Sequence, residues 1–190
     1  LSLLGVEDQK KGYEPLLPGV KFIRFNNIND INLINSKTAA VVLETIQGGA
    51  GFILPKNNFL KLVKKKCQST GTLLILDEIQ PGFGRTGKLF GFEHYDVIPD
   101  IIVMGKGMGG GLPIGAFCSS KKMMRLLENN PKLGHITTFG GNPVVAASAL
   151  ATLKTIYKEN LIDSVNEKEM LFRKRLDHTL IKKINGKGLM

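Results

Sequence analysis

Four short runs of mainly apolar residues alternate along the chain with polar or glycine-rich segments. They cover residues 39–44, 72–77, 100–106 and 114–120, and the first three are rich in Val, Ile and Leu. Apolar runs of this length, bounded by turn-forming residues, are typical of buried strands. We therefore expect strands in the first three runs and a fourth strand in the last one, which follows the glycine-rich segment GMGGGLP.

Between the first two runs, apolar residues recur at the spacing of a helix. Phe59 and Val63 lie on its apolar face, and Gly71 is placed to end it. A second helix is expected at residues 142–160, because a proline occupies its first turn and small residues follow. A third, amphipathic helix is expected at about residues 162–180.

This alternation of strands and helices predicts an α/β fold, in which a sheet has helices packed on its faces. Three of the expected strands deliver a charged residue at the carboxyl end and are followed by glycine-rich segments. These residues are Glu44, Asp77 and Lys106. Ligands of open α/β sheets bind at this edge, so the three strand ends are the place where chemistry is expected.

Composition places the chain among ordinary globular proteins, with 43% apolar and 22% charged residues in a length of 190. A formal charge of +10 raises the question of nucleic-acid binding. The densest basic run, residues 61–66, lies within the first expected helix, whose apolar spacing leaves the lysines on the solvent face. No interleaved aromatic platform or recognition motif accompanies them, so we expect no nucleic-acid partner.

Neither a membrane partner nor a metal site is expected. No apolar run approaches the length of a membrane helix, and the first residues lack a basic leader and a cleavage site, so a cytoplasmic location is the default. Cys67 and Cys118 match no metal-ligand spacing and are too few for a disulfide framework. We interpret both as reduced thiols of the core or the surface.

Lys106 stands directly after the apolar IIVMG and directly before the flexible GMGGG. The residues alone leave two interpretations open: a surface lysine in a turn, or an amine that forms a Schiff base or serves a phosphate-binding loop. A Walker loop is excluded, because the order GxxxxGK[ST] is not met. Asp77 has comparable alternatives, since an acid at a strand end can cap a helix, pair with a cation or bind a ligand.

The segment 76–116, which contains LDEIQPGFGRTG and VMGKGMGGGLPIGA, is followed by HITTFGGNP. Together these motifs resemble the signature of class III aminotransferases, the fold-type-I pyridoxal-phosphate (PLP) enzymes that include ornithine, acetylornithine and γ-aminobutyrate aminotransferases. The resemblance covers nearly the whole chain. It implies an α/β large domain, a mostly parallel sheet with helices on both faces, followed by the start of a small C-terminal α+β domain.

By position, the resemblance implies that Lys106 forms the Schiff base with PLP and transfers the proton in the reaction. It implies that Asp77 contacts the pyridine nitrogen, whose protonated form makes the ring an electron sink. Gln80 matches a residue near the phenolic oxygen, and Ile79 one that packs on the ring. Thr138 matches a threonine that reaches the cofactor phosphate from the neighbouring subunit, which implies a homodimer with shared active sites. A polar turn, core packing and a helix cap are the respective structural alternatives for the last three.

The resemblance also divides the chain. Residues 1–141 correspond to part of the PLP-binding large domain, 142–160 to an interdomain helix and 161–190 to the beginning of the small domain. The family is considerably longer than this chain, which is therefore expected to be an internal fragment without the phosphate motif and the arginine that binds the substrate carboxylate. The closing INGKGLM is expected to be a loop that enters a strand.

The implied reaction is transamination between an ornithine- or acetylornithine-like amino donor and a 2-oxo acid. An aminomutase or racemase on the same scaffold, or a fragment that is inactive by itself, is the alternative, although Gln80 in DEIQ argues against the glutamate-semialdehyde aminomutase branch. Ornithine and γ-aminobutyrate aminotransferases carry a second glutamate where this chain has Gly49, downstream of Glu44, so the substrate cannot be copied from them. Three further residues of the matched segments are expected to be structural: Arg85, His94 and His135.

Overall fold

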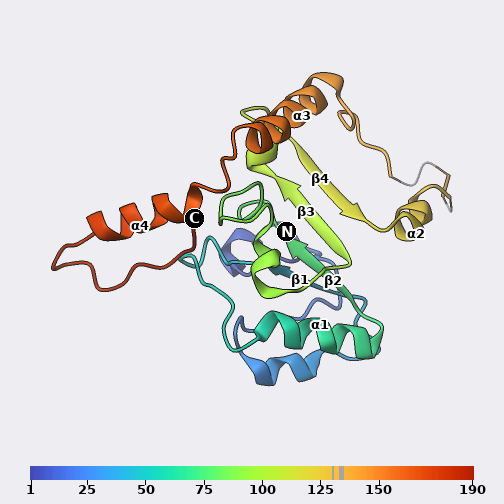
Figure 1. Cartoon of the computed structure of the whole chain (residues 1–190). Coiled ribbons are helices and arrows are strands. Elements are labelled where there is room, and N and C mark those ends of the chain that lie inside the picture. Colours follow the sequence, from blue (N-terminus) through green and yellow to red (C-terminus); the bar gives the residue numbers. More distant parts are fainter. Residues whose placement is uncertain (130, 133–134) are drawn as a thin grey trace.

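A mixed sheet forms the centre of the molecule (Figure 1). The computed structural model describes residues 1–129, 131–132 and 135–190. Within these residues the strands lie in the order β1 (Ala40–Glu44), β2 (Leu73–Asp77), β3 (Ile101–Gly105) and β4 (Gly115–Ser119). β2 is parallel to both β1 and β3, whereas β4 is antiparallel to β3. The expected strands and the mostly parallel sheet are confirmed.

The strand register brings the three charged strand ends to one edge of the sheet. Glu44 pairs with Asp77, and Asp77 pairs with Val103. β3 continues past Val103 to Gly105, and Lys106 follows directly. The carboxyl ends of the parallel strands therefore form the edge at which open α/β sheets bind their ligands.

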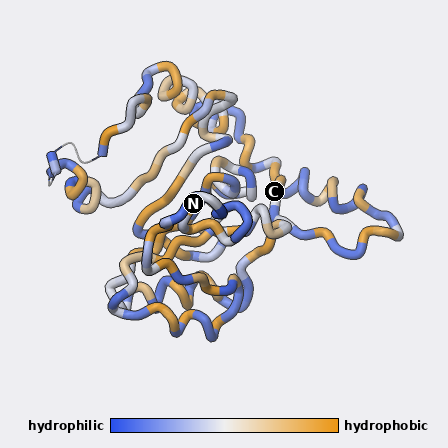
Figure 2. Tube along the Cα trace, turned by 180° about the vertical axis from the view of Figure 1, so that it is seen from behind, coloured by the Kyte–Doolittle hydropathy of each residue, from blue (hydrophilic) through white to orange (hydrophobic). Residues whose placement is uncertain are grey.

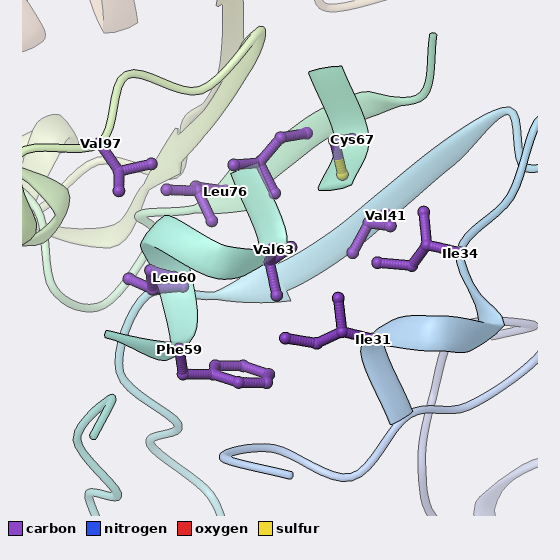
Figure 3. Close-up of a cluster of buried hydrophobic side chains, with 10 residues drawn as sticks. Ile31, Ile34, Val41, Phe59, Leu60, Val63, Cys67, Leu76 and Val97 are labelled. Atoms are coloured by element: carbon purple, nitrogen blue, oxygen red, sulfur yellow. The ribbon is translucent and has the colours of Figure 1, made fainter. Parts of the chain in front are cut away.

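Helix α1 (Phe59–Thr70) packs against β2 through its apolar face. Gly71 ends the helix in the left-handed conformation, with φ of 72°, as the sequence predicts. Burial raises the pKa of the Cys67 thiol to about 11, which keeps this core cysteine protonated. The core between helix and sheet (Figure 3) comprises Ile31, Ile34, Val41, Phe59, Leu60, Val63, Cys67, Leu74, Leu76 and Val97.

The basic face of α1 is partly neutralised by acids that precede β3. The Nζ atom of Lys61 lies 3.0 Å from Asp96 Oδ2, and that of Lys64 lies 3.0 Å from Asp100 Oδ2. The Asp100 carboxylate also accepts a hydrogen bond of 2.8 Å from the backbone N–H of Leu74. Part of the positive charge of the chain therefore attaches α1 to its neighbouring segment.

Helix α3 (Pro143–Lys158) begins with a proline in its first position, where such a residue is expected. Its N-cap is Asn142, whose Oδ1 accepts hydrogen bonds from the backbone N–H groups of Val144 at 3.0 Å and Val145 at 3.3 Å. The helix packs against the 3-10 helix η4 (Lys106–Gly109), which follows β3. Hydrophobic residues recur along the trace of the molecule, α3 included (Figure 2). Several of those on α3 are exposed, among them Val144, Leu150 and Tyr157.

Helix α4 (Val165–Arg175) is shorter than the helix expected at residues 162–180, and that prediction is wrong at both ends. Asn160 has a left-handed backbone with φ of 50°, which separates α4 from α3. Leu180 is 82% exposed, so the apolar residues beyond Arg175 have no surface that would stabilise another turn. No helix of the described ranges is long and apolar enough to cross a membrane. The remaining helical segments are short: η1 (Glu7–Gln9), η2 (Ile28–Leu33), η3 (Gly91–Tyr95), α2 (Lys121–Met124) and η5 (Arg125–Leu127).

The C-terminal segment lies between α4 and the loop that follows β2. The guanidinium of Arg173 donates a hydrogen bond of 2.8 Å to the carbonyl of Gly186, and the Glu169 carboxylate accepts one of 2.6 Å from the N–H of Gly188. The N–H of Leu189 donates to the carbonyl of Arg85 at 2.8 Å. Gly186 and Gly188 have φ of 112° and 64°, which interrupts an extended chain. The strand expected in INGKGLM is therefore absent from this segment.

Candidate active site

Lys106 lies at the carboxyl end of β3, as its place in the sequence predicts. It is the first residue of η4 and is exposed to solvent. Its backbone is left-handed, with φ of 44°. This conformation is uncommon for a residue with a side chain and occurs preferentially at functional sites. The lysine is thus carried on a constrained turn, with its amine accessible to a ligand.

Asp77 is the half-buried last residue of β2, the strand next to β3. Its Oδ1 accepts a hydrogen bond of 2.9 Å from the backbone N–H of Ile79. Its Oδ2 makes no hydrogen bond within the described part of the chain. One carboxylate oxygen is therefore available to a ligand donor at the same sheet edge as Lys106.

Ile79 lies against β3 just before the lysine. A Cβ atom added to Gly105 would be 3.6 Å from Cγ2 of Ile79 and 3.1 Å from the carbonyl oxygen of Ile114. The Ile79 side chain therefore lies next to Gly105 at an ordinary contact distance, whereas the Ile114 carbonyl makes the tighter approach. The sheet edge thus presents an apolar side chain between the acid of β2 and the amine that follows β3.

Gln80 contacts the loop that follows β1. A Cβ atom added to Gly48 would overlap Oε1 of Gln80, so only a glycine leaves the amide its present place. The Glu44 carboxylate accepts a hydrogen bond of 2.9 Å from the N–H of Gly48, which fixes this loop. Gly49, which stands at the position of the missing second glutamate, is exposed, and a Cβ atom there would meet nothing within 4 Å.

Glu78, between Asp77 and Ile79, is completely buried. Its carboxylate accepts hydrogen bonds from the Thr45 hydroxyl at 2.5 Å and from the backbone N–H groups of Gly91 at 2.7 Å and Phe92 at 2.9 Å. Burial raises the pKa of this carboxyl, and the three hydrogen bonds oppose the shift. The sequence predicted no role for Glu78; the signal that could have found it is a second acid directly after a strand-end acid.

Helix α3 supports the glycine-rich turn that carries Lys106. The Ser148 hydroxyl donates a hydrogen bond of 2.7 Å to the carbonyl of Gly109. Gly110 has φ of 58°, and a Cβ atom there would overlap the hydroxyl of Thr152. Small side chains on α3 and glycines in the turn thus permit close packing between them.

Thr138 is not brought to this sheet edge. It is exposed, in the segment that connects α2 with α3 outside the sheet (Figure 1). Lys106, Asp77, Ile79 and Gln80 therefore belong to one region of the molecule, whereas Thr138 belongs to another.

His94, Arg85 and His135 have the structural surroundings that the sequence predicted. Nε2 of His94 lies 3.0 Å from the carbonyl oxygen and 3.1 Å from the hydroxyl of Thr86, and burial lowers the pKa of its imidazole. The Arg85 carbonyl binds the C-terminal segment. The ring of His135 packs edge-on against Phe117, with 5.2 Å between centroids.

Comparison with known proteins identifies the family. The model of the family described as aminotransferase class III matches residues 7–190. The chain therefore belongs to the class III aminotransferases, as the motifs around Asp77 and Lys106 suggested.

Individual relatives lie close to this chain in sequence. It is 40% identical over 195 residues to the LysW-aminoadipate semialdehyde/glutamate semialdehyde transaminase of Sulfolobus acidocaldarius, and the match covers 100% of this chain and 50% of that protein. It is also 40% identical over 196 residues to the acetylornithine aminotransferase of Caldanaerobacter subterraneus, again over 100% of this chain and 49% of the relative. The chain thus spans about half the length of the curated relatives it matches.

Solved structures agree with the fold. The ornithine aminotransferase of Toxoplasma gondii superimposes with a TM-score of 0.89 at 34% identity, over 97% of this chain and 45% of that one. The acetylornithine aminotransferase of Elizabethkingia anophelis gives a TM-score of 0.82 at 36% identity, over 94% and 46% of the two chains. The α/β fold expected from the sequence is therefore that of these aminotransferases.

Proposed function

We propose that the full-length protein is a PLP-dependent aminotransferase and that this chain supplies its cofactor-binding lysine and carboxylate. One observation carries the proposal: Asp77 ends β2 and Lys106 directly follows the adjacent parallel strand β3 at the ligand-binding edge, with Ile79 next to Gly105 at the end of β3. An amine, a carboxylate oxygen without a protein partner and an apolar side chain are the groups that the aldehyde, the pyridine nitrogen and the ring of PLP require.

Each residue has a defined task in this proposal. Lys106 would hold the cofactor through its amine, and the same amine would serve as the base that moves the substrate proton. Asp77, as a carboxylate, keeps the pyridine nitrogen protonated. Ile79 excludes water from the ring face, and Gln80 donates to the phenolic oxygen through its amide. PLP, when bound, supplies the electron sink that makes the substrate C–H bond acidic.

The proposed substrates are an ornithine- or acetylornithine-like amino donor and a 2-oxo acid. The names of the relatives support this choice, since one is an acetylornithine aminotransferase and another a transaminase of semialdehydes. A transaminase needs both substrates, whereas an aminomutase turns over without an external oxo acid. An assay of acetylornithine and ornithine with and without 2-oxoglutarate therefore distinguishes the two reactions.

We also propose that the protein is a cytoplasmic homodimer in which Thr138 reaches the cofactor phosphate of the neighbouring subunit. The exposure of Thr138, in the segment between α2 and α3, supports this arrangement. The proposed division of the chain places residues 1–141 in the large domain, 142–160 in the interdomain helix and 161–190 in the small domain. The beginning of α3 and its capping by Asn142 support the first boundary.

Replacement of Lys106 tests the assignment directly. We expect full-length Lys106→Ala to retain no covalently bound PLP after borohydride reduction, as measured by mass spectrometry of the intact protein. Lys121→Ala, which removes an exposed lysine of α2, is the control and should be labelled like the wild type. Labelling of Lys106→Ala at the wild-type level would show that another lysine binds the cofactor.

A further inference from the structure

Glu78 carries a completely buried carboxyl group that the proposed chemistry does not use. Burial of a carboxylate is costly unless donors replace its water shell. Here Thr45, Gly91 and Phe92 provide those donors at 2.5, 2.7 and 2.9 Å. Its main chain is equally constrained, because its N–H donates to the carbonyl of Val103 at 2.8 Å and its carbonyl accepts from Gly82 at 3.0 Å.

These bonds join the segments that surround the candidate site. Thr45 follows the last residue of β1 and leads into the loop whose Gly48 contacts Gln80. Gly91 and Phe92 begin η3 and return the chain to the end of β2. The Glu78 side chain therefore holds both neighbouring loops against the β2 end, from the side opposite to Asp77, as expected for successive residues of an extended strand.

The segments joined by Glu78 are also packed closely against the end of β2. Thr45 makes two hydrogen bonds to the end of β2. Its backbone N–H donates to the carbonyl of Asp77 at 3.4 Å, which is long, whereas its hydroxyl donates to the Glu78 carboxylate at 2.5 Å, which is short. A Cβ atom at Gly91 would be 2.9 Å from Cβ of Pro81, so the loop after Gln80 is packed without spare room. Loss of the Glu78 bonds would loosen the two loops that flank Asp77 and Gln80.

We propose that Glu78 is a positioning residue, which together with Thr45 holds Asp77 and Gln80 in the arrangement that binds PLP. The inference rests on the proposed function, in which Asp77 and Gln80 contact the cofactor. Residues that contact a ligand hold their geometry only when the groups behind them are themselves fixed. Glu78 makes hydrogen bonds to the loop after β1, to the start of η3 and to β3.

The test is PLP affinity of the full-length apoprotein, measured by titration of cofactor absorbance, together with the unfolding temperature without PLP. In Glu78→Gln one amide –NH₂ faces donors, so at least one hydrogen bond is lost, and we expect PLP affinity to fall roughly tenfold or more, with a shifted absorbance band. Glu93→Gln is the matched control. Glu93 is an exposed acid of η3, the helix that begins with Gly91 and Phe92, and its carboxylate accepts a hydrogen bond of 2.8 Å from the N–H of Phe90. This variant should bind PLP like the wild type.

Thr45 provides a second pair of variants if Glu78→Gln does not fold. Thr45→Val removes the donor at constant shape and should weaken PLP binding, whereas Thr45→Ser keeps the hydroxyl and should restore it. Lower unfolding temperatures with unchanged PLP affinity and spectrum in Glu78→Gln and Thr45→Val would overturn the inference and leave Glu78 a purely structural residue. Failure of the wild type itself to attach PLP at Lys106 would instead refute the proposed function.

Discussion

At the residue scale, the two adjacent glycines of the loop after β1 differ in what a side chain would meet. A Cβ atom at Gly48 would overlap the amide of Gln80, whereas one at Gly49 would point into open space. Neither residue has a positive φ within the left-handed region, so alanine is compatible with both backbones. Alanine at Gly48 should therefore move the Gln80 side chain, whereas alanine at Gly49 tests only the effect of an added methyl group on the same loop.

We expect Gly48→Ala to displace the flexible end of Gln80 while the fold persists, with a change in unfolding free energy of within about 1 kcal/mol. PLP affinity should fall by about tenfold, because the proposed hydrogen bond of Gln80 to the cofactor would be lost. Gly49→Ala, the control, should change neither quantity. Titration with PLP and thermal unfolding measure both, and equal PLP affinity of the two variants would contradict a cofactor contact by Gln80.

At the element scale, α3 acts as a support for η4. The hydrogen bond from Ser148 to Gly109 at 2.7 Å is a side-chain contact between the long helix and the turn that begins with Lys106. Thr152 closes the space beside Gly110, whose φ of 58° suits a glycine. The helix therefore contacts the turn that begins with Lys106 through Gly109 and Gly110.

Ser148→Ala tests this support. Loss of its hydrogen bond should lower the unfolding free energy by about 0.5–1.5 kcal/mol and slow the borohydride-trapped attachment of PLP to Lys106. Thr155→Ala removes an exposed hydroxyl from the same helix and serves as the control. If both variants attach PLP at the same rate, the contact contributes stability alone.

The elements also show where sequence patterns succeed and where they do not. The sequence could place Asp77 and Lys106 at one edge because the carboxyl ends of parallel strands lie at the same edge of a sheet. That prediction required only the identification of the two strands. Glu78 could not be predicted in this way, because its partners Thr45 and Gly91 lie 33 and 13 positions away, and only the folded loops bring them together. The expected helix beyond Arg175 failed for the converse reason: its apolar spacing continued, but Leu180 has nothing to pack against.

At the scale of the whole molecule, the side of the chain that carries α3 is rich in exposed apolar residues. Phe139, next to Thr138, is 83% exposed, and Ile136 is 69% exposed. Large apolar groups that gather on a surface mark interaction sites more often than isolated ones do. The proposed second copy of the chain, with Thr138 contributing to its cofactor site, would cover these exposed apolar side chains.

Mixed dimers test whether Thr138 acts across the subunit boundary. Thr138→Ala and Lys106→Ala should each impair transamination when alone, the second completely. In a heterodimer of the two variants, one subunit keeps Lys106 and the other keeps Thr138. If the threonine acts on the partner's cofactor, these two residues form one wild-type site, and activity rises above that of either parent. If Thr138 acts within its own chain, no complete site forms and mixing gives no gain. Mixing Lys106→Ala with Asp77→Ala is the control, because both residues lie at the same sheet edge of one chain and no complete site should form.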